Sequence, residues 1–186
     1  MIAVERLVFQ NRCASRPSPN WQSRCSNASG RRLCPFAFVV ADTVYGGNLD
    51  LRTWLETCQY SYVLAVPCNE PVGILTLDGQ RRRVEVGEVE ALRLGAHDWQ
   101  RLSMSEGTKG PRLFDWACVP MLHRWEDDGR HWVLIRRSLT DPNEKAYYFV
   151  FAPQGTTLPE MVQAIGARWH IEEDAGKRQR PRTGSL

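Results

Sequence analysis

Three carboxylates and one arginine have the types and spacings that metal-assisted chemistry needs. Asp42 directly follows an apolar run, and open α/β sheets place their sites at the carboxyl ends of buried strands. Arg168 and Glu172 are four residues apart, so they share one face of a helix, and Glu173 follows. Carboxylates converging from a strand and a helix can hold two Mg²⁺ or Mn²⁺ ions ~3.5–4 Å apart, which stabilise the attacking and leaving oxygens of a phosphoryl displacement. The sequence therefore predicts a divalent-metal site formed by Asp42 and Glu172, with Glu173 as the alternative to Glu172.

The same residues also fit plain structural roles. Asp42 precedes a glycine pair at 46–47, where an Asp often caps a helix or closes a turn. Arg168 and Glu172 fit an ordinary surface ion pair, which contributes a few tenths of a kcal/mol. Trp169 lies beside these charges and favours a partly buried helix. Both readings stay open at this point.

The elements that would position Asp42 form a strand-helix-strand unit. Residues 35–41 are a continuous apolar run, typical of a strand covered on both faces. Asn48 is a plausible N-cap for a helix over 49–58, whose apolar residues follow a helical stripe. Residues 61–66 form a second apolar run. Because short links join the three elements, the two strands are predicted to be parallel.

The middle of the chain predicts antiparallel strands. The Asp128-Gly129 pair is a strong hairpin signal, and His123 and His131, which flank it, are predicted to be surface residues. A short helix is predicted over 88–94. A final helix is predicted from about 158 to 173, because a capping box precedes it. The strands are predicted over residues 81–86, 112–124, 131–136 and 146–151.

Charge divides the chain into a mildly acidic middle and two basic ends. The net charge is +5 for residues 1–34, −6 for 35–174 and +4 for 175–186. Asn, Ser, Arg, Pro and Gly dominate 10–33, and 177–186 has almost no apolar residue. Both ends are therefore predicted to be disordered basic segments.

Composition also excludes some classes of protein. The longest apolar run, Pro35 to Ala41, is far shorter than the ~20 residues of a membrane helix. The six cysteines form no CxxC motif and no Cys/His spacing typical of a zinc finger. Because no apolar signal-peptide core follows Met1, we expect a cytoplasmic protein with free thiols and no membrane partner.

Two segments resemble motifs of one protein family. The segment Val39–Gly46, VVADTVYG, resembles the second-aspartate motif of bacterial insertion-sequence transposases, the DDE-superfamily endonucleases of ribonuclease-H-like fold. The segment Arg168–Glu173, RWHIEE, resembles the last motif of that family, in which an Arg precedes the catalytic Glu by four positions. The region between them is similar to the β-rich insertion of such transposases. The two acids stand in the family's order, 130 residues apart.

The resemblance implies a fold and a domain organisation. It implies an α/β chain in which residues 35–174 form a partial ribonuclease-H-like domain with a β-rich insertion at about 69–151. The basic segments 1–34 and 175–186 lie outside that domain.

The resemblance also implies an activity. Asp42 and Glu172 would be the catalytic, metal-binding carboxylates, and Arg168 would contact DNA phosphate or position the Glu. The cofactor would be Mg²⁺ or Mn²⁺, and the partner would be DNA at transposon ends, with an oligomer possible in the parent family. The reaction would be hydrolysis of a DNA strand at a transposon end, followed by attack of the freed 3′-hydroxyl on target DNA.

The sequence departs from the family at a decisive position. The family requires a first Asp on an earlier strand, but the only acid before Asp42 is Glu5. The family's Tyr and Lys near the last motif are replaced by Ile165 and Gln179. We therefore expect a transposase fragment, read out of its original frame at each end and inactive alone. Two alternatives stay open: a non-catalytic nucleic-acid-binding protein with basic ends that contact phosphate, and an inert pseudogene product.

Overall fold

The strand-helix-strand unit predicted around Asp42 is present in the computed structural model, which describes residues 8–11, 37–107 and 110–166. Strands β2 (Ala37–Ala41) and β3 (Ser61–Val66) are parallel, with Val40 opposite Val63. Between them run helices α1 (Thr43–Gly46) and α2 (Leu49–Thr57). The predicted strands, helix and parallel pairing are confirmed, because adjacent parallel strands need such a crossover.

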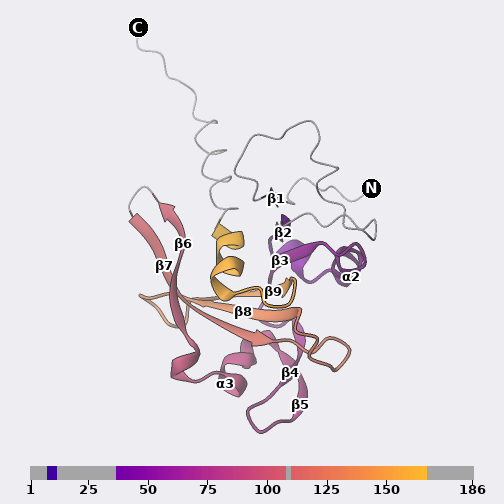
Figure 1. The fold of residues 1–186 in the computed structure, drawn as a ribbon. Helices are drawn as coiled ribbons and strands as arrows, with labels where there is room; N and C mark the ends of the chain where they lie inside the picture. Colours follow the sequence, from indigo (N-terminus) through magenta and orange to yellow (C-terminus); the bar gives the residue numbers. More distant parts are fainter. Residues whose placement is uncertain (1–7, 12–36, 108–109, 167–186) are drawn as a thin grey trace, which may run out of the picture.

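Local capping fixes both crossover helices. The Asn48 side chain accepts a hydrogen bond from the Leu51 amide at 3.0 Å and so begins α2, as predicted. The Asp42 side chain does the same for α1. Leu55 of α2 is fully buried against the sheet. The helices therefore cover one face of the sheet (Figure 1).

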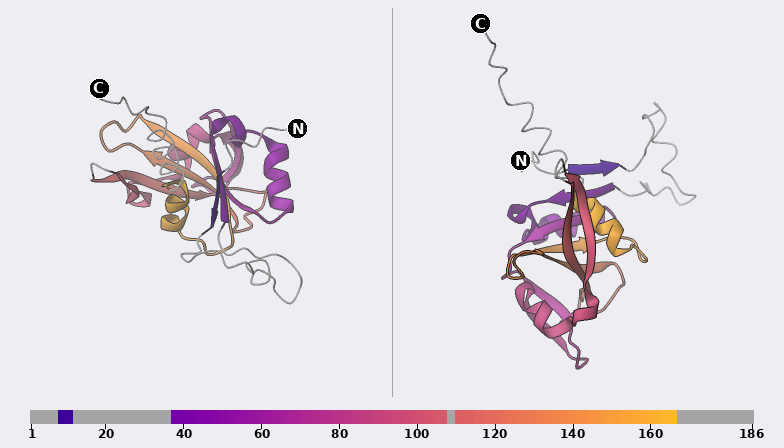
Figure 2. Two further views of the ribbon diagram at one scale, coloured as in Figure 1. Left: turned by 90° about the horizontal axis from the view of Figure 1, so that it is seen from above. Right: turned by 90° about the vertical axis from the view of Figure 1, so that its left-hand side faces the viewer.

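The sheet continues from the parallel pair as a curled, mostly antiparallel structure with the order β1-β2-β3-β9-β8-β7-β6 (Figure 2). The hairpin predicted at Asp128-Gly129 joins β7 to β8, which pair antiparallel. Strand β9 pairs with β3 on one side and β8 on the other, so the β-rich section extends the same sheet. The additional strands are β1 (Val8–Asn11), β6 (Gln100–Gly107), β7 (Gly110–Pro120), β8 (His131–Arg137) and β9 (Lys145–Phe151).

A small two-stranded hairpin with short helices after it packs on the face of the sheet that carries α2. Its apolar residues Val72, Ile74, Val86 and Val89 are buried in the same cluster as Leu55. The predicted short helix over 88–94 is confirmed by α3. The elements are β4 (Pro71–Leu75), β5 (Arg81–Glu85), the 3-10 helix η2 (Val86–Glu88), α3 (Val89–Arg93) and the 3-10 helix η3 (Ala96–Asp98).

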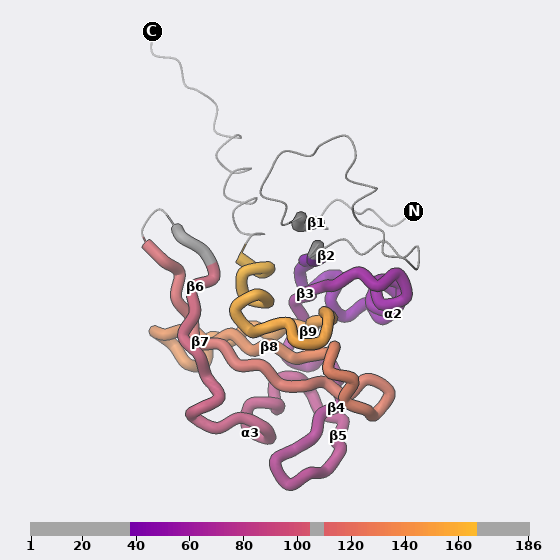
Figure 3. The backbone as a smooth tube through the Cα atoms, in the orientation of Figure 1, coloured from indigo at the N-terminus to yellow at the C-terminus, as the bar shows by residue number. Residues whose placement is uncertain are grey.

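A helix over residues 158–166 covers the opposite face (Figure 3). The Glu160 carboxylate accepts a hydrogen bond from the Thr157 amide at 2.8 Å, as expected of a capping box. Met161 and Ile165 are buried against Phe38 of β2 and other residues of that face. The described structure is therefore a mixed α/β fold, dominated by strands, with helices on both faces of one sheet.

Two further observations bear on the predictions. Strand β1 lies inside the basic segment 1–34, where the composition predicts no strand, and pairs antiparallel with β2. Within the described ranges, no helix combines the length and the apolar character that crossing a membrane requires.

Gly46 allows α1 to lie against the backbone of β3. A Cβ at Gly46 would lie 1.8 Å from the Ala65 carbonyl oxygen, a contact that only a backbone movement can relieve. We expect Gly46→Ala to lower the free energy of unfolding by about 2–3 kcal/mol, measured by urea denaturation. The control is Gly73→Ala, whose Cβ would meet its nearest neighbours at 3.4 Å. Equal stability of the two variants would contradict this close approach.

Candidate functional site

Asp42 stands directly after β2, at the carboxyl end of the parallel pair, as predicted. Its Oδ1 accepts a hydrogen bond from the Val44 amide at 3.1 Å, so Asp42 is also the N-cap of α1. The capping role weighed from the sequence is thus confirmed. It does not exclude metal binding, because a carboxylate offers about four acceptor positions.

The partners predicted for Asp42 lie outside the described residues. These are Arg168, Glu172 and the alternative Glu173, and their positions relative to Asp42 are not part of the described structure. The helix over 158–166, which leads toward them, packs on the face of the sheet formed in part by Phe38 and Val40 of β2. The strand that ends at Asp42 therefore carries this helix.

The described residues do not complete a Mg²⁺ site at Asp42. Strand β1, which pairs with β2, has the sequence VFQN and carries no carboxylate. In the part of the chain that the structure describes, Asp42 belongs to no group of three metal-ligating side chains. Since Mg²⁺ requires near-ideal oxygen coordination, no catalytic step follows from Asp42 alone.

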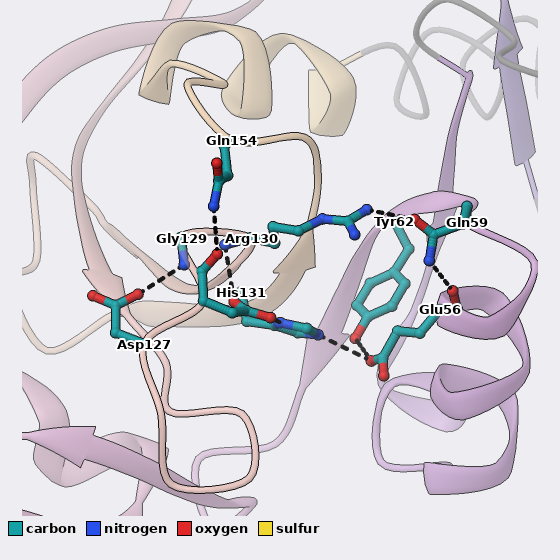
Figure 4. A network of polar contacts seen from close by, with 9 residues as sticks. Glu56, Gln59, Tyr62, Asp127, Gly129, Arg130, His131 and Gln154 are labelled. Carbon is teal, nitrogen blue, oxygen red and sulfur yellow. Dashed lines mark hydrogen bonds and ion pairs between the residues drawn. The ribbon is translucent and has the colours of Figure 1, made fainter. Parts of the chain in front are cut away.

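A second cluster of chemically capable residues lies at the other end of the crossover (Figure 4). Glu56 is in the last turn of α2, and the buried Tyr62 of β3 donates its hydroxyl hydrogen to Glu56 Oε1 at 2.7 Å. His131 Nε2, from the start of β8, lies 3.3 Å from the same oxygen. The contact is close enough for an ion pair, but its geometry is not that of a hydrogen bond, and Nε2 is buried without a hydrogen-bond partner.

The hairpin turn fixes the orientation of His131. Its Nδ1 lies 2.7 Å from Asp128 Oδ2, and the imidazole is only 3% exposed. Asp128 is held in turn, because its Oδ1 accepts a hydrogen bond from the Arg130 amide at 2.9 Å. Nδ1 therefore faces a carboxylate acceptor and carries a hydrogen, which leaves Nε2 directed at Glu56.

His123 is the third member of the cluster and covers one face of the His131 ring. Its ring stacks on the ring of His131, with centroids 4.4 Å apart and an interplanar angle of 10°. His123 is half-buried and belongs to a short turn, where its amide and carbonyl bond to the backbone of Glu126. Ligand atoms of Glu56, His123 and His131 all lie within 4.8 Å of one another.

An outer layer of contacts holds the cluster in place. Arg130 donates to Gln59 Oε1 at 2.9 Å, and Gln59 donates to the Glu56 carbonyl at 2.8 Å. The Arg130 guanidinium lies over the Phe151 ring at 4.4 Å. Gln154 donates to the Asp128 carbonyl. The hydrogen bonds from Arg130 to Gln59 and from Gln59 to Glu56 therefore join the β7–β8 hairpin to the end of α2.

The electrostatics of the cluster favour charged carboxylates and a neutral His123. Burial opposes the charge of Glu56, but the contacts with His131 and the Tyr62 hydroxyl outweigh it and lower the pKa of Glu56. For Asp128, burial is likewise outweighed, by the Arg130 amide and by His131, so its pKa is lowered. Burial and the neighbouring His131 lower the pKa of His123. Burial and the Glu56 carboxylate raise the pKa of Tyr62, which keeps its proton.

The sequence prediction that His123 and His131 are surface residues is wrong for His131, which is 2% exposed. His131 opens β8 opposite Phe151 of β9, and its ring is covered by the rings of Phe151 and His123 and by Glu56 of α2. The sequence feature that could have indicated a paired His131 is the spacing Asp128-x-x-His131 across a tight turn, because such a turn places the carboxylate beside the imidazole. Nothing local indicated Glu56, which lies on a distant element.

A comparison with models of known protein families and a comparison with curated proteins find no match to this chain. The transposase resemblance therefore depends on the two motifs themselves.

Acid should weaken the fold through Glu56 and Asp128. Their folded pKa values lie below the ordinary values of 4.5 and 3.8, so each stabilises the fold above its ordinary pKa. That stability is lost as the pH falls through the lower folded pKa. We expect wild-type protein to lose more unfolding free energy between pH 6 and about pH 3 than Glu56→Gln, measured by denaturant titration at each pH.

The matched control is Glu126→Gln, which changes an exposed carboxylate in the neighbouring turn. It should keep the wild-type dependence on pH. If Glu56→Gln and wild type lose stability in parallel, Glu56 does not contribute to acid sensitivity.

Proposed function

We propose that this chain is an incomplete catalytic domain of a DDE-type transposase, with a partial ribonuclease-H-like fold. Asp42 would be its second metal-binding carboxylate and Glu172 its third. The observation that carries the proposal is the position of Asp42, within VVADTVYG, at the carboxyl end of a buried strand that is parallel to its neighbour. Open α/β sheets bind their ligands at this edge.

The helix on the opposite face of the sheet supports the same assignment. Residues 158–166 pack on the face to which Phe38 and Val40 of β2 contribute. The chain then continues into RWHIEE, the second motif of the resemblance. One strand therefore ends at the first candidate carboxylate, and the helix seated on that strand leads toward the second.

The described residues prepare Asp42 for this role in two ways. The hydrogen bond from the Val44 amide restricts the rotamer of the carboxylate, which lowers the entropy cost of holding a cation. Gly46 lets α1 lie directly on β3, which fixes the turn that carries Asp42. Arg168 would contact DNA phosphate or position Glu172.

We also propose that this chain alone does not cleave DNA. The family's first Asp has no counterpart on β1, whose four residues are VFQN. Two carboxylates bind Mg²⁺ weakly, because this ion gives up its water reluctantly. When complete, such a site supplies metal-assisted hydrolysis and strand transfer.

We expect purified full-length chain to show no Mg²⁺-dependent cleavage of its cognate DNA ends. We expect Mn²⁺, at millimolar concentration, to broaden the NMR signals of residues 40–46 and 168–173 together, since a shared paramagnetic ion relaxes both segments. Asp42→Asn should abolish the broadening of both segments, while retaining the helix cap, because Asn caps as well as Asp.

The control is Asp50→Asn, which alters an exposed carboxylate in the first turn of α2 and should leave the broadening unchanged. Broadening at 40–46 that survives Glu172→Gln would refute the shared site. Cleavage of cognate ends that disappears in Asp42→Asn would refute the incompleteness of the site.

A further inference from the structure

The buried imidazole of His131 has one nitrogen that the protein leaves without a hydrogen-bond partner. Nδ1 is directed at Asp128 at 2.7 Å, whereas Nε2 has no hydrogen bond although the side chain is only 3% exposed. A buried polar atom of this kind normally costs free energy unless it is satisfied by some group. Nε2 lies 3.3 Å from Glu56 Oε1, and the His123 ring is stacked on the same imidazole.

We propose that Glu56, His123 and His131 bind a first-row divalent metal ion, with Zn²⁺ as the best fit. Two imidazoles and one carboxylate are a set of three protein ligands that Zn²⁺ uses, with the fourth position left to water. Imidazole ligands favour Zn²⁺ over Mg²⁺. The site is therefore chemically distinct from the oxygen site proposed at Asp42, and it shares no residue with it.

Distances in the cluster agree with this assignment. Tetrahedral Zn²⁺, with bonds of about 2.0–2.2 Å, holds its ligand atoms ~3.3 Å apart. His131 Nε2 and Glu56 Oε1 are already 3.3 Å apart. One ligand atom from each of Glu56, His123 and His131 lies within 4.8 Å of the other two. Because the two rings are stacked, metal binding requires His123 to tilt out of the stack, a movement that its half-buried position in a turn permits.

The surroundings match those of metal ligands. A metal-binding His usually donates its other ring nitrogen to a carboxylate, which fixes its tautomer, and Asp128 occupies that position beside His131. The ligating carboxylate is also usually hydrogen-bonded, as Glu56 is by Tyr62.

The same geometry has one metal-free explanation, in which His131 is doubly protonated and lies between the charges of Asp128 and Glu56. In that state Nε2 carries a hydrogen and cannot ligate an ion. The two states differ in the protonation of Nε2, so an experiment can separate them.

The experiment uses the full-length chain, stripped with a chelator and kept reduced. Co²⁺ is titrated and followed by the visible absorption of tetrahedral Co²⁺, and Zn²⁺ is then added in competition. We expect one equivalent of Co²⁺ to bind and to be displaced by Zn²⁺. His123→Ala, which alters a half-buried residue, should weaken binding at least tenfold, and Asp128→Asn about 10- to 100-fold.

The matched control is His97→Ala, since the His97 side chain is 88% exposed and lies on η3. It should bind Co²⁺ as wild type does. A long-range ¹H–¹⁵N spectrum should show His131 Nε2 without a hydrogen in the Zn²⁺-loaded protein. Absence of binding, binding unaffected by His123→Ala, or a doubly protonated His131 in the presence of Zn²⁺ would each overturn the proposal.

Discussion

The parallel pairing of β2 and β3 is the constraint on which both candidate sites depend. Parallel neighbours cannot be joined by a tight turn, so the chain must cross over the sheet between them. The crossover is short, which presses α1 onto β3 at Gly46. It places Asp42 at its beginning and Glu56 near its end, with Tyr62 of β3 within hydrogen-bond distance of Glu56. The crossover between β2 and β3 therefore determines the position of both sites.

The second constraint is the partial burial of three ionisable side chains beside an aromatic ring. His131 packs against Phe151, while Asp128 and Glu56 approach its two nitrogens. Removing one member of such a group leaves a buried charge without a partner, which costs more than the group contributes when complete. The end of α2 and the β7–β8 hairpin are thereby coupled, although 75 residues separate Glu56 from His131.

Local patterns predicted the elements well, and non-local pairing limited the rest. The boundaries of β2, α2 and β3 follow from apolar runs and from the Asn48 cap, which act over a few residues. The place of β9 between β3 and β8 depends on which edges meet in space, and periodicity carries no such information. Strand β1 precedes a stretch rich in Asn, Ser, Arg and Pro, and the local sequence does not indicate its pairing with the distant β2.

The two candidate sites differ in the same way, because one depends on local sequence and the other on contacts between distant segments. The position of Asp42 follows from the end of an apolar run, so the sequence predicts it. The burial of His131 depends on the pairing of β8 with β9 and on the approach of α2, so a lone His beside a hairpin gives no hint of it. Arg168 and Glu172 lie beyond the described residues, and their part of the interpretation stays a prediction.

The proposed function requires a stable core without the strand that would bear the first Asp, and the described fold supplies such a core. Apolar residues of β2 are buried on both faces, Val39 under the crossover helices and Val40 under the helix over 158–166. Strand β9 covers the open edge of β3, and β1 covers part of the edge of β2. A sheet edge left open invites pairing with other chains, so even four residues of β1 have a protective effect. Under the proposed function, the missing first carboxylate would remove a ligand for catalysis and leave in place the burial that stabilises the domain.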